Sequence, residues 1–192
     1  LDRKSQRLKK LTEDLVEASK ASTGSLSVHL ERLGMVQLLQ QALGEFEEKF
    51  AQSGLTVVPR FPPEELWIMA DGRHLWRIID NLLSNCNKYA QSGTRIYVDI
   101  LQQEGRAVLT IKNVSRQQLN IPARQLMERF VRGDESRTTE GSGLGLSIAR
   151  SLTELQGGQF DIAIDGDLFK ATLSFPEAPP QTEEALSLPS DP

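Results

Sequence analysis

Residues 81–90, NLLSNCNKYA, place three asparagines and a lysine inside a segment that otherwise has the pattern of a buried helix. Asparagine is a poor helix former because its short amide competes for backbone hydrogen bonds. At 3.6 residues per turn, Asn81, Asn85 and Lys88 share a face that is separate from the apolar stripe. Amide oxygens suit Mg²⁺, which often takes further ligands from phosphates, and an ammonium group can hold a phosphate. The helix alone is equally compatible with solvated polar residues on an ordinary surface.

A second stretch, RGDESRTTEGSGLGLSIARSL, alternates Gly141, Gly143 and Gly145 directly before an apolar-periodic helix. Glycines let backbone N–H groups approach an anion closely, and a helix N-terminus adds a partial positive charge, so the stretch could cradle a phosphate. A dinucleotide fingerprint would need glycine where Leu146 stands, and no Walker lysine follows Gly145. The alternative interpretation is a flexible hinge.

The chain that must position these residues divides into three parts. Residues 1–23 form the pattern of an amphipathic helix that needs a partner surface. Its apolar positions are Leu8, Leu11, Leu15 and Ala18. Residues 24–177 mix helix and strand patterns, and the Pro-rich, acidic tail 178–192 is predicted to be disordered.

The mixed patterns of the middle part predict an α+β fold, a two-layer sandwich of a mixed sheet and helices preceded by one amphipathic helix. Helices and strands do not alternate regularly, which argues against a doubly wound sheet. The predicted strands are 26–30, 55–61, 66–70, 94–101, 106–114, 158–164 and 169–175. The predicted helices are 36–52, 73–90, 122–130 and a segment that ends near residue 156.

Composition narrows the function classes. The 192 residues are 39% hydrophobic, enough to bury a core, and the net charge of −4 argues against a sequence-independent nucleic-acid binder. No apolar run approaches the roughly 20 residues needed to cross a membrane, so no membrane contact is expected from this chain. The single Cys86 excludes an internal disulfide and fits a reducing compartment. A start within a helical pattern and without Met suggests a piece of a longer protein.

Taken together and in this order, the two stretches resemble the catalytic and ATP-binding domain of sensor histidine kinases, within the ATPase superfamily that includes gyrase and MutL. The matching segments are NLLSNCNKYA, two strands, and ERFVRGDESRTTEGSGLGLSIARSLTELQGG. The resemblance covers about residues 26–176. The segment DRKSQRLKKLTEDLVEASKASTG also looks like the second helix of the dimerisation and phosphoacceptor hairpin that precedes such domains.

The resemblance implies ATP and Mg²⁺ as cofactors and assigns roles to single residues. Asn81 and Asn85 match the N-box asparagines and would ligate the metal, Asn85 foremost. Asn81, Lys88 and Arg132 are the expected catalytic residues, with Arg132 in the lid over the phosphates. The other residues assigned to the nucleotide are Tyr89, Asn113, Phe130, Gly141, Ser142, Gly143, Leu144 and Gly145.

One box departs from the family pattern. The family has an Asp-x-Gly-x-Gly run whose carboxylate accepts a hydrogen bond from the adenine amino group, whereas this chain reads IKNVSRQQLNIP. Asn113 aligns with that aspartate, and no glycines follow. An asparagine carbonyl can still accept from the amine, and its NH₂ can donate to a ring nitrogen. Losing the charged partner is expected to weaken adenine binding by about 1 to 2 kcal/mol.

The family's phosphoacceptor histidine is followed directly by an acidic residue. His29 is followed by Leu30 and His74 by Leu75, so neither fits and both are predicted to be structural or surface residues. The acceptor helix is therefore expected to be absent from this chain. Trp67 and Trp76 are expected in the core or at a domain contact, and Cys86 in the core.

The resulting hypothesis is a bacterial two-component transferase that moves the ATP γ-phosphate to a histidine on the hairpin of its own homodimeric parent, for relay to a response regulator in signal transduction. The chain would be a cytoplasmic domain of a membrane-bound sensor. One alternative is a degenerate nucleotide-binding scaffold without turnover. Another is an ATPase that drives conformational change, but such enzymes carry a glutamate base where this helix offers Arg77 and Asp80.

Overall fold

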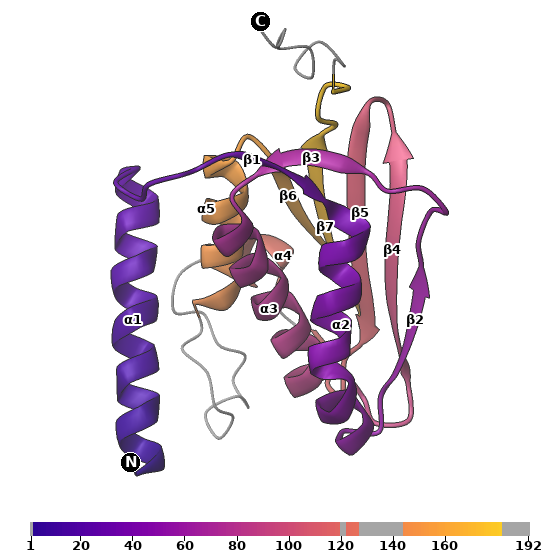
Figure 1. The fold of residues 1–192 in the computed structure, drawn as a ribbon. Coiled ribbons are helices and arrows are strands. Elements are labelled where there is room, and N and C mark those ends of the chain that lie inside the picture. Colours follow the sequence, from indigo (N-terminus) through magenta and orange to yellow (C-terminus); the bar gives the residue numbers. More distant parts are fainter. Residues whose placement is uncertain (1, 120–121, 127–143, 182–192) are drawn as a thin grey trace, which may run out of the picture.

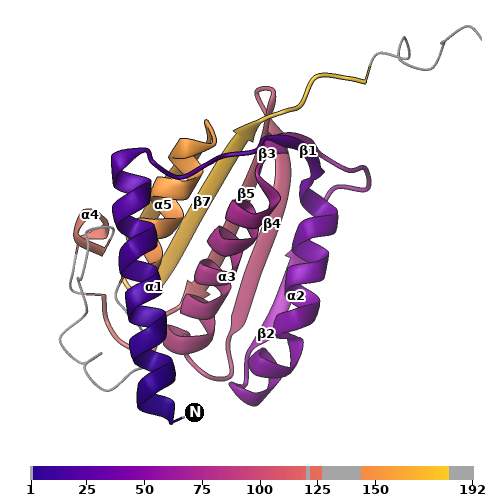
Figure 2. The same cartoon turned by 60° about the vertical axis from the view of Figure 1, so that its left-hand side comes forward.

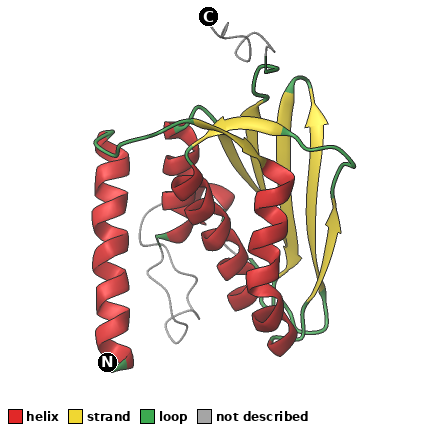
Figure 3. Cartoon of the chain, in the orientation of Figure 1, coloured by secondary structure: helices red, strands yellow, loops and turns green. Residues whose placement is uncertain are grey.

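The computed structural model describes residues 2–119, 122–126 and 144–181. Figure 1 labels the elements and Figure 3 separates helix from strand. The helices are α1 (Arg3–Thr23), α2 (Met35–Gln52), α3 (Gly72–Tyr89), α4 (Ala123–Leu126) and α5 (Gly145–Leu155). The strands are β1 (Glu31–Gly34), β2 (Thr56–Arg60), β3 (Trp67–Ala70), β4 (Arg95–Gln103), β5 (Arg106–Val114), β6 (Gln159–Asp165) and β7 (Leu168–Pro176).

The main sheet has the strand order β2-β4-β5-β7-β6. β2 runs parallel to β4, and the other pairs are antiparallel, so the sheet is mixed as predicted. Helices α2, α3 and α5 lie on one face of it (Figures 1 and 2). This arrangement confirms the α+β two-layer sandwich.

The core forms where the two-residue period of the strands meets the helical period of α3. Along β5, alternate residues from Ala107 to Asn113 are buried, and the residues between them point to the outer face. On α3 the buried positions Leu75, Ile78, Ile79, Leu82 and Cys86 form the facing stripe. The apolar pattern therefore orients α3 and leaves its polar side chains on other faces.

A distant carboxylate caps the start of α2. Glu65 accepts hydrogen bonds from the backbone N–H groups of Val36 (2.7 Å) and Gln37 (3.0 Å), which have no partner inside the helix. A Cβ atom on Gly34 would lie 2.5 Å from the Glu65 carboxylate. Glycine at this position therefore makes room for the cap.

Asp71 joins three segments at the start of α3. It accepts from the N–H groups of Arg73 and His74 in the first turn of α3 and, at 2.9 Å, from the N–H of His29. Its own N–H donates to the Gln156 side chain at the end of α5 (2.7 Å). Burial raises the pKa of the Asp71 carboxyl, but the N–H groups of His29 and His74, the His74 ring and the N–H of Arg73 together outweigh burial, so the pKa lies below its usual value.

The predicted first strand at 26–30 is wrong, because β1 begins only at Glu31. The His74 ring donates to the carbonyl of Ser27 (2.8 Å), and the N–H of His29 is taken by Asp71. These backbone groups are held by side chains of α3 and of its N-cap residue Asp71, so they cannot join a strand ladder. His29 therefore precedes β1, with its ring exposed. Of the predicted helix 122–130, Ala123–Leu126 form α4, residue 122 precedes it outside the helix, and residues 127–130 lie outside the described residues.

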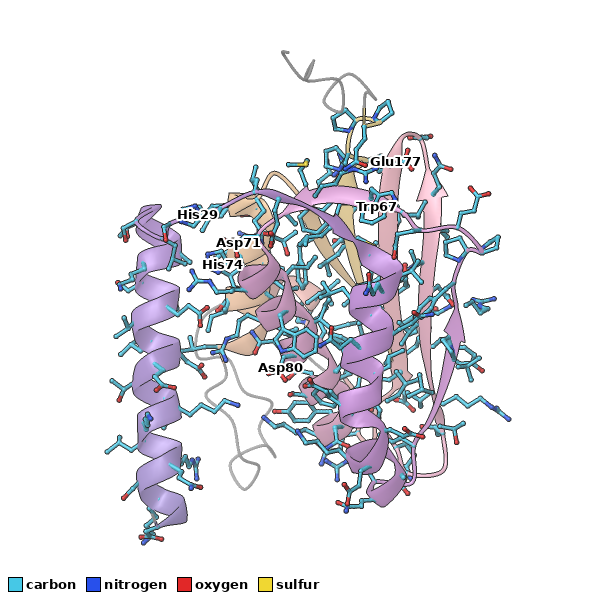
Figure 4. All side chains as sticks on the ribbon, viewed as in Figure 1. His29, Trp67, Asp71, His74, Asp80 and Glu177 are labelled. Atoms are coloured by element: carbon cyan, nitrogen blue, oxygen red, sulfur yellow. The ribbon has the colours of Figure 1, made fainter. Side chains whose placement is uncertain are left out.

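Strands β1 and β3 form a short two-stranded sheet beside the main sheet, and the segment that follows β7 contacts β3. Ile68 bridges to Glu177, and the N–H of Ala178 donates to the carbonyl of Trp67 (2.7 Å). Figure 4 labels Trp67 and Glu177 at this end of the molecule. Trp67 is 38% exposed under the Arg32 guanidinium, which lies 4.3 Å from the ring centre, so it is not a core residue, and its expected alternative, a domain contact, stays a prediction. Trp76 does pack against the core.

Helix α1 packs against α5 and reaches α3 through ion pairs (Figure 2). Its buried residues are Asp14, Ala18 and Ala21, whereas Leu8 and Leu15 are 66% and 49% exposed. The amphipathic helix is confirmed, but the leucine stripe is not the face that the chain itself covers. The division into 1–23, 24–177 and 178–192 stays a prediction, and residues 182–192 lie outside the described part.

Candidate functional site

The two stretches that carried the chemistry meet in space. The Asn81 amide Nδ2 on α3 donates to the backbone carbonyl of Gly145, the first residue of α5, at 3.3 Å. A Cβ on Gly145 would be in ordinary contact with the Asn81 side chain. The bond spans 64 residues of sequence. Because Nδ2 is used, the Asn81 Oδ1 remains as the acceptor or metal ligand of that amide.

Asn85 lies one turn farther along α3. Its side chain is half-buried and makes no hydrogen bond to the part of the chain that the structure describes. The amide offers one oxygen and two N–H donors, and the partial burial limits the water available to satisfy them. Asn81 and Asn85 therefore present amide oxygens at adjacent turns, a donor set that fits Mg²⁺ with additional oxygens from phosphate and water.

The third asparagine of the run does something different. The Ser53 hydroxyl, at the end of α2, donates to Asn87 Oδ1 at 2.8 Å. Asn87 therefore fastens the C-terminal end of α3 to the end of α2. Its type alone gave no sign of this, because Ser53 lies 34 residues away.

The C-terminal end of α3 is also tied to the chain after β5. The Arg116 side chain donates to the carbonyl of Lys88, and the backbone N–H of Arg116 donates to the carbonyl of Tyr89 (2.9 Å). The Lys88 side chain is half-buried and that of Tyr89 is 38% exposed. Both predicted site residues thus lie on the last turn of the helix that carries Asn81 and Asn85.

Asn113 lies on the inner face of β5, under α3. It is 4% exposed, and the Cys86 thiol donates to its Oδ1 at 3.6 Å. Cys86 is itself buried, as predicted, and burial raises the pKa of its thiol to about 12. The thiol therefore stays protonated and remains a donor. Asn113 is thus brought next to the residue that follows Asn85.

The start of α5 is built by Leu144 and Gly145. The Leu144 side chain is fully buried, and its carbonyl accepts from Ser147 Oγ (2.9 Å) and from the N–H of Ile148 (2.9 Å). Contact between Leu144 and a ligand would therefore involve its backbone. The other predicted site residues lie outside the described part of the chain: Phe130, Arg132, Gly141, Ser142 and Gly143.

Sequence reasoning missed the function of Arg77, which lies one turn before Asn81. Its guanidinium pairs with Asp14, and its Nε donates to Glu17 at 3.1 Å. Both acids are on α1, where a spacing of three puts them on one face. That spacing, with an arginine on the polar side of α3, was the available signal. Arg77 thus connects α1 to the helix that carries the asparagines.

The two histidines hold structure or lie at the surface, as predicted. His74 is 8% exposed, donates to Ser27 and lies 3.8 Å from an Asp71 oxygen. Figure 4 shows His29, Asp71 and His74 together near one end of α3, with Asp80 farther along the helix. Within the described ranges, no three His, Cys, Asp or Glu side chains gather as a metal site, and no helix there is long and apolar enough to span a bilayer.

Comparison with known proteins identifies related sequences. Residues 70–183 match the family described as histidine kinase-, DNA gyrase B-, and HSP90-like ATPase. Signal transduction histidine-protein kinase BaeS of Escherichia coli (strain K12) is 30% identical over 154 residues, which cover 79% of this chain and 33% of that protein. Adaptive-response sensory kinase SasA of Rippkaea orientalis is 31% identical over 170 residues, 86% of this chain and 44% of that one. The chain thus spans a third to under a half of these two relatives.

Solved structures show the same fold. Full-length ShkA in complex with AMPPNP superposes with a TM-score of 0.79 at 21% identity, over 94% of this chain and 38% of that one. Histidine kinase AdeS of Acinetobacter baumannii gives 0.70 at 16% identity, over 90% and 79%. With the family match over more than half of its length, the chain belongs to the histidine kinase-, DNA gyrase B- and HSP90-like ATPases, and the relatives it matches are sensor histidine kinases.

Proposed function

We propose that this chain is the ATP-binding catalytic part of a two-component sensor histidine kinase and transfers the γ-phosphate of ATP to a histidine on a helical hairpin. The observation that carries the proposal is the Asn81–Gly145 hydrogen bond, which joins the asparagine helix to the glycine-led start of α5. Asn85, one turn on, has an amide with no partner among the described residues. Membership of this ATPase family supports ATP as the nucleotide.

The residues of α3 and α5 would act by positioning and by offsetting charge. When bound, Mg²⁺ neutralises developing negative charge on the triphosphate. The amide oxygens of Asn85 and Asn81 would hold it, while Gly145 and the preceding glycines let backbone N–H groups approach the phosphates. Lys88 and Arg132 are the proposed cations beside the phosphates. Holding the reactants in line accounts for most of the acceleration that phosphoryl transfer needs.

The acceptor histidine is proposed to come from a hairpin outside this chain. His74 is buried, its ring is engaged with Ser27, and it lies at the opposite end of α3 from Asn85. A phosphoacceptor needs a neighbouring base and an approach in line with the leaving group. The parent is proposed to be a homodimeric, membrane-bound bacterial sensor with this part in the cytoplasm, passing the phosphate to a response regulator.

Calorimetric titration of the 192-residue chain with ATP, with and without Mg²⁺, tests the site. Saturable binding that strengthens with Mg²⁺ is expected, and no binding at millimolar ATP would refute the proposal. Incubation with radiolabelled ATP then tests the transfer. Acid-labile label is expected on an added hairpin bearing the acceptor histidine, slowly because tethering is lost. Label on His29 or His74 would show that the acceptor assignment is wrong, and an unlabelled hairpin despite ATP binding would indicate a non-catalytic scaffold.

A further inference from the structure

Asn113 and Cys86 form a polar pair inside an otherwise apolar layer between β5 and α3. Asn113 pairs in register with Phe169 of β7, and Ile111, two residues earlier on the same face, is buried in the core. Neither side chain offers a hydrogen-bond partner. Cys86 is thus the polar side chain that contacts the Asn113 amide among the described residues.

The thiol fixes which way the amide faces. The buried Cys86 thiol donates to Asn113 Oδ1 at 3.6 Å. In the reverse orientation, the amide NH₂ would face the S–H group, and sulfur is only a weak acceptor. The arrangement with carbonyl toward thiol is therefore the favoured one, and it turns the Asn113 NH₂ away from Cys86.

The Asn113 NH₂ group is left with hydrogens to donate. It has no hydrogen-bond partner among the described residues, although the residue is only 4% exposed. The Asn113 nitrogen is also not fully enclosed by protein. Among the described residues, the side-chain nitrogen or oxygen atom that is fully enclosed and lacks a partner is Arg32 Nε, and not Asn113 Nδ2. A donor at the edge of a closed layer, next to the helix with the unpartnered Asn85, is suited to an acceptor on a ligand.

We infer that Asn113, oriented by Cys86, presents a hydrogen-bond donor to the nucleobase, so that the site accepts 6-oxopurine nucleotides about as well as adenine nucleotides. This inference rests on the proposed function, which places a nucleotide at α3. A donor can pair with N1 of adenine or with O6 of hypoxanthine. A carboxylate at the same position would instead favour the 6-amino group of adenine and repel a 6-oxo group. Cys86 is a positioning residue in this arrangement.

ATP and ITP provide a direct test because they differ only at position 6 and N1 of the purine. ATP has a 6-amino group and an unprotonated N1, whereas ITP has a 6-oxo group and a proton on N1. Calorimetric Kd values would be measured with Mg²⁺ for both nucleotides in the full chain. In the unmodified protein we expect the two values to agree within about threefold, since one neutral hydrogen bond is made in either case. Asn113→Asp should shift the ratio toward ATP by about tenfold or more, because the donor is replaced by a charged acceptor.

Two variants of Cys86 separate orientation from stability. Cys86→Ala frees the amide to turn its carbonyl outward and should shift the ratio toward ATP by about three- to fivefold. Cys86→Ser keeps a donor of similar size and should restore the original ratio. If Cys86 had only a structural role, Cys86→Ala would weaken the binding of ATP and ITP alike and leave the ratio of their Kd values unchanged.

The outcomes are distinct. A preference for ATP above tenfold in the unmodified chain, or a ratio that Cys86→Ala leaves unchanged, would overturn the inference while the proposed function stands. Failure of both nucleotides to bind the unmodified chain would overturn the proposed function and the inference together. Thermal unfolding of each variant, monitored by circular dichroism, verifies that the ratios are compared between folded proteins.

Discussion

The polar side chains at the N-terminal end of α3 are satisfied differently from those of Asn81 and Asn85. At that end, the N-cap residue Asp71 and the helix residues His74 and Arg77 each bond to another segment: the linker before β1, the end of α5, or α1. Farther along the helix, Asn81 uses its amide N–H on Gly145, and Asn85 makes no hydrogen bond to the described residues. Polar groups that hold the fold are satisfied within the chain, whereas an unsatisfied one at partial burial indicates a place for a ligand.

This contrast predicts that substitutions of Asp71 and Arg77 change stability or docking, and that substitutions of Asn85 change ligand binding. Asp71→Ala should have the largest effect, a loss of about 3 kcal/mol in the free energy of unfolding, because three backbone N–H groups lose a charged acceptor in a buried place. Urea unfolding measures it. Asp80→Ala removes the same group from the same helix, where Asp80 has no partner among the described residues, and should cost under about 0.5 kcal/mol. Equal losses in both variants would contradict the comparison.

Arg77→Ala should release α1 from the rest of the molecule. It leaves the Asp14 carboxylate, 6% exposed, without its counter-charge, at a cost of about 2 to 3 kcal/mol since the Arg77 side chain is itself 28% exposed. Hydrogen exchange of the α1 amides should accelerate by at least about tenfold, while that of the β5 amides stays slow.

Arg73→Ala is the matched control for Arg77→Ala. Arg73 is exposed on the first turn of α3, and no ion pair of its side chain is seen in the described ranges. Exchange in α1 should be unchanged. If Arg77→Ala left α1 as protected as Arg73→Ala does, the ion pairs would not be what holds α1 in place.

Asn85→Ala should weaken Mg²⁺-dependent ATP binding by about tenfold or more, roughly 1.4 kcal/mol, with under about 0.5 kcal/mol change in unfolding. Asn87→Ala, two residues along, should do the reverse: lose about 1 kcal/mol of stability with its Ser53 bond and keep ATP affinity. Calorimetry and urea unfolding of both variants give the two pairs of values. Affinity that falls equally in both would remove the distinction between the asparagines.

The smallest expected effect is on the pH dependence of stability. The pKa of Asp71 is lowered in the folded protein, so its contribution is fully present above the usual carboxyl pKa of about 3.9 and is lost as pH falls through the folded pKa. Asp71→Asn lacks that titration. The difference in unfolding free energy between the two proteins should therefore be constant near neutral pH and shrink below about pH 4. A difference that stays constant down to pH 2 would refute the assignment.

Much of the fold and part of the site could be predicted because the local periodicity of apolar residues determines the element types and the faces on which side chains lie. The strand at 106–114 was predicted with the bounds that β5 has, and α2 and α3 begin within one residue of their predicted starts. Asn81 and Gly145, predicted from separate stretches, are joined by a hydrogen bond. Spacing at 3.6 residues per turn was sufficient to put Asn81 and Asn85 on one face of a helix.

Partners distant in sequence could not be predicted. Nothing local marks Asn87 as the partner of Ser53 or Glu65 as the cap of α2. The strand predicted at 26–30 failed for the same reason, since the N–H of His29 bonds to Asp71, 42 residues away. A backbone N–H donates to whichever acceptor the packed structure brings to it.

By itself, the sequence determined the element types, the apolar faces and the order of two chemical motifs, because side-chain size and polarity act over one or two turns of chain. Tertiary structure decided which polar groups are used up and which stay available. Asn81, Asn85, Asn87 and Asn113 have the same side chain but different neighbours. Asn81 donates to the Gly145 carbonyl, Asn87 accepts from the Ser53 hydroxyl, and Asn113 accepts from the Cys86 thiol. Asn85 has no partner among the described residues. An amide has the same donors and acceptors everywhere, and its role follows from the neighbours that folding supplies.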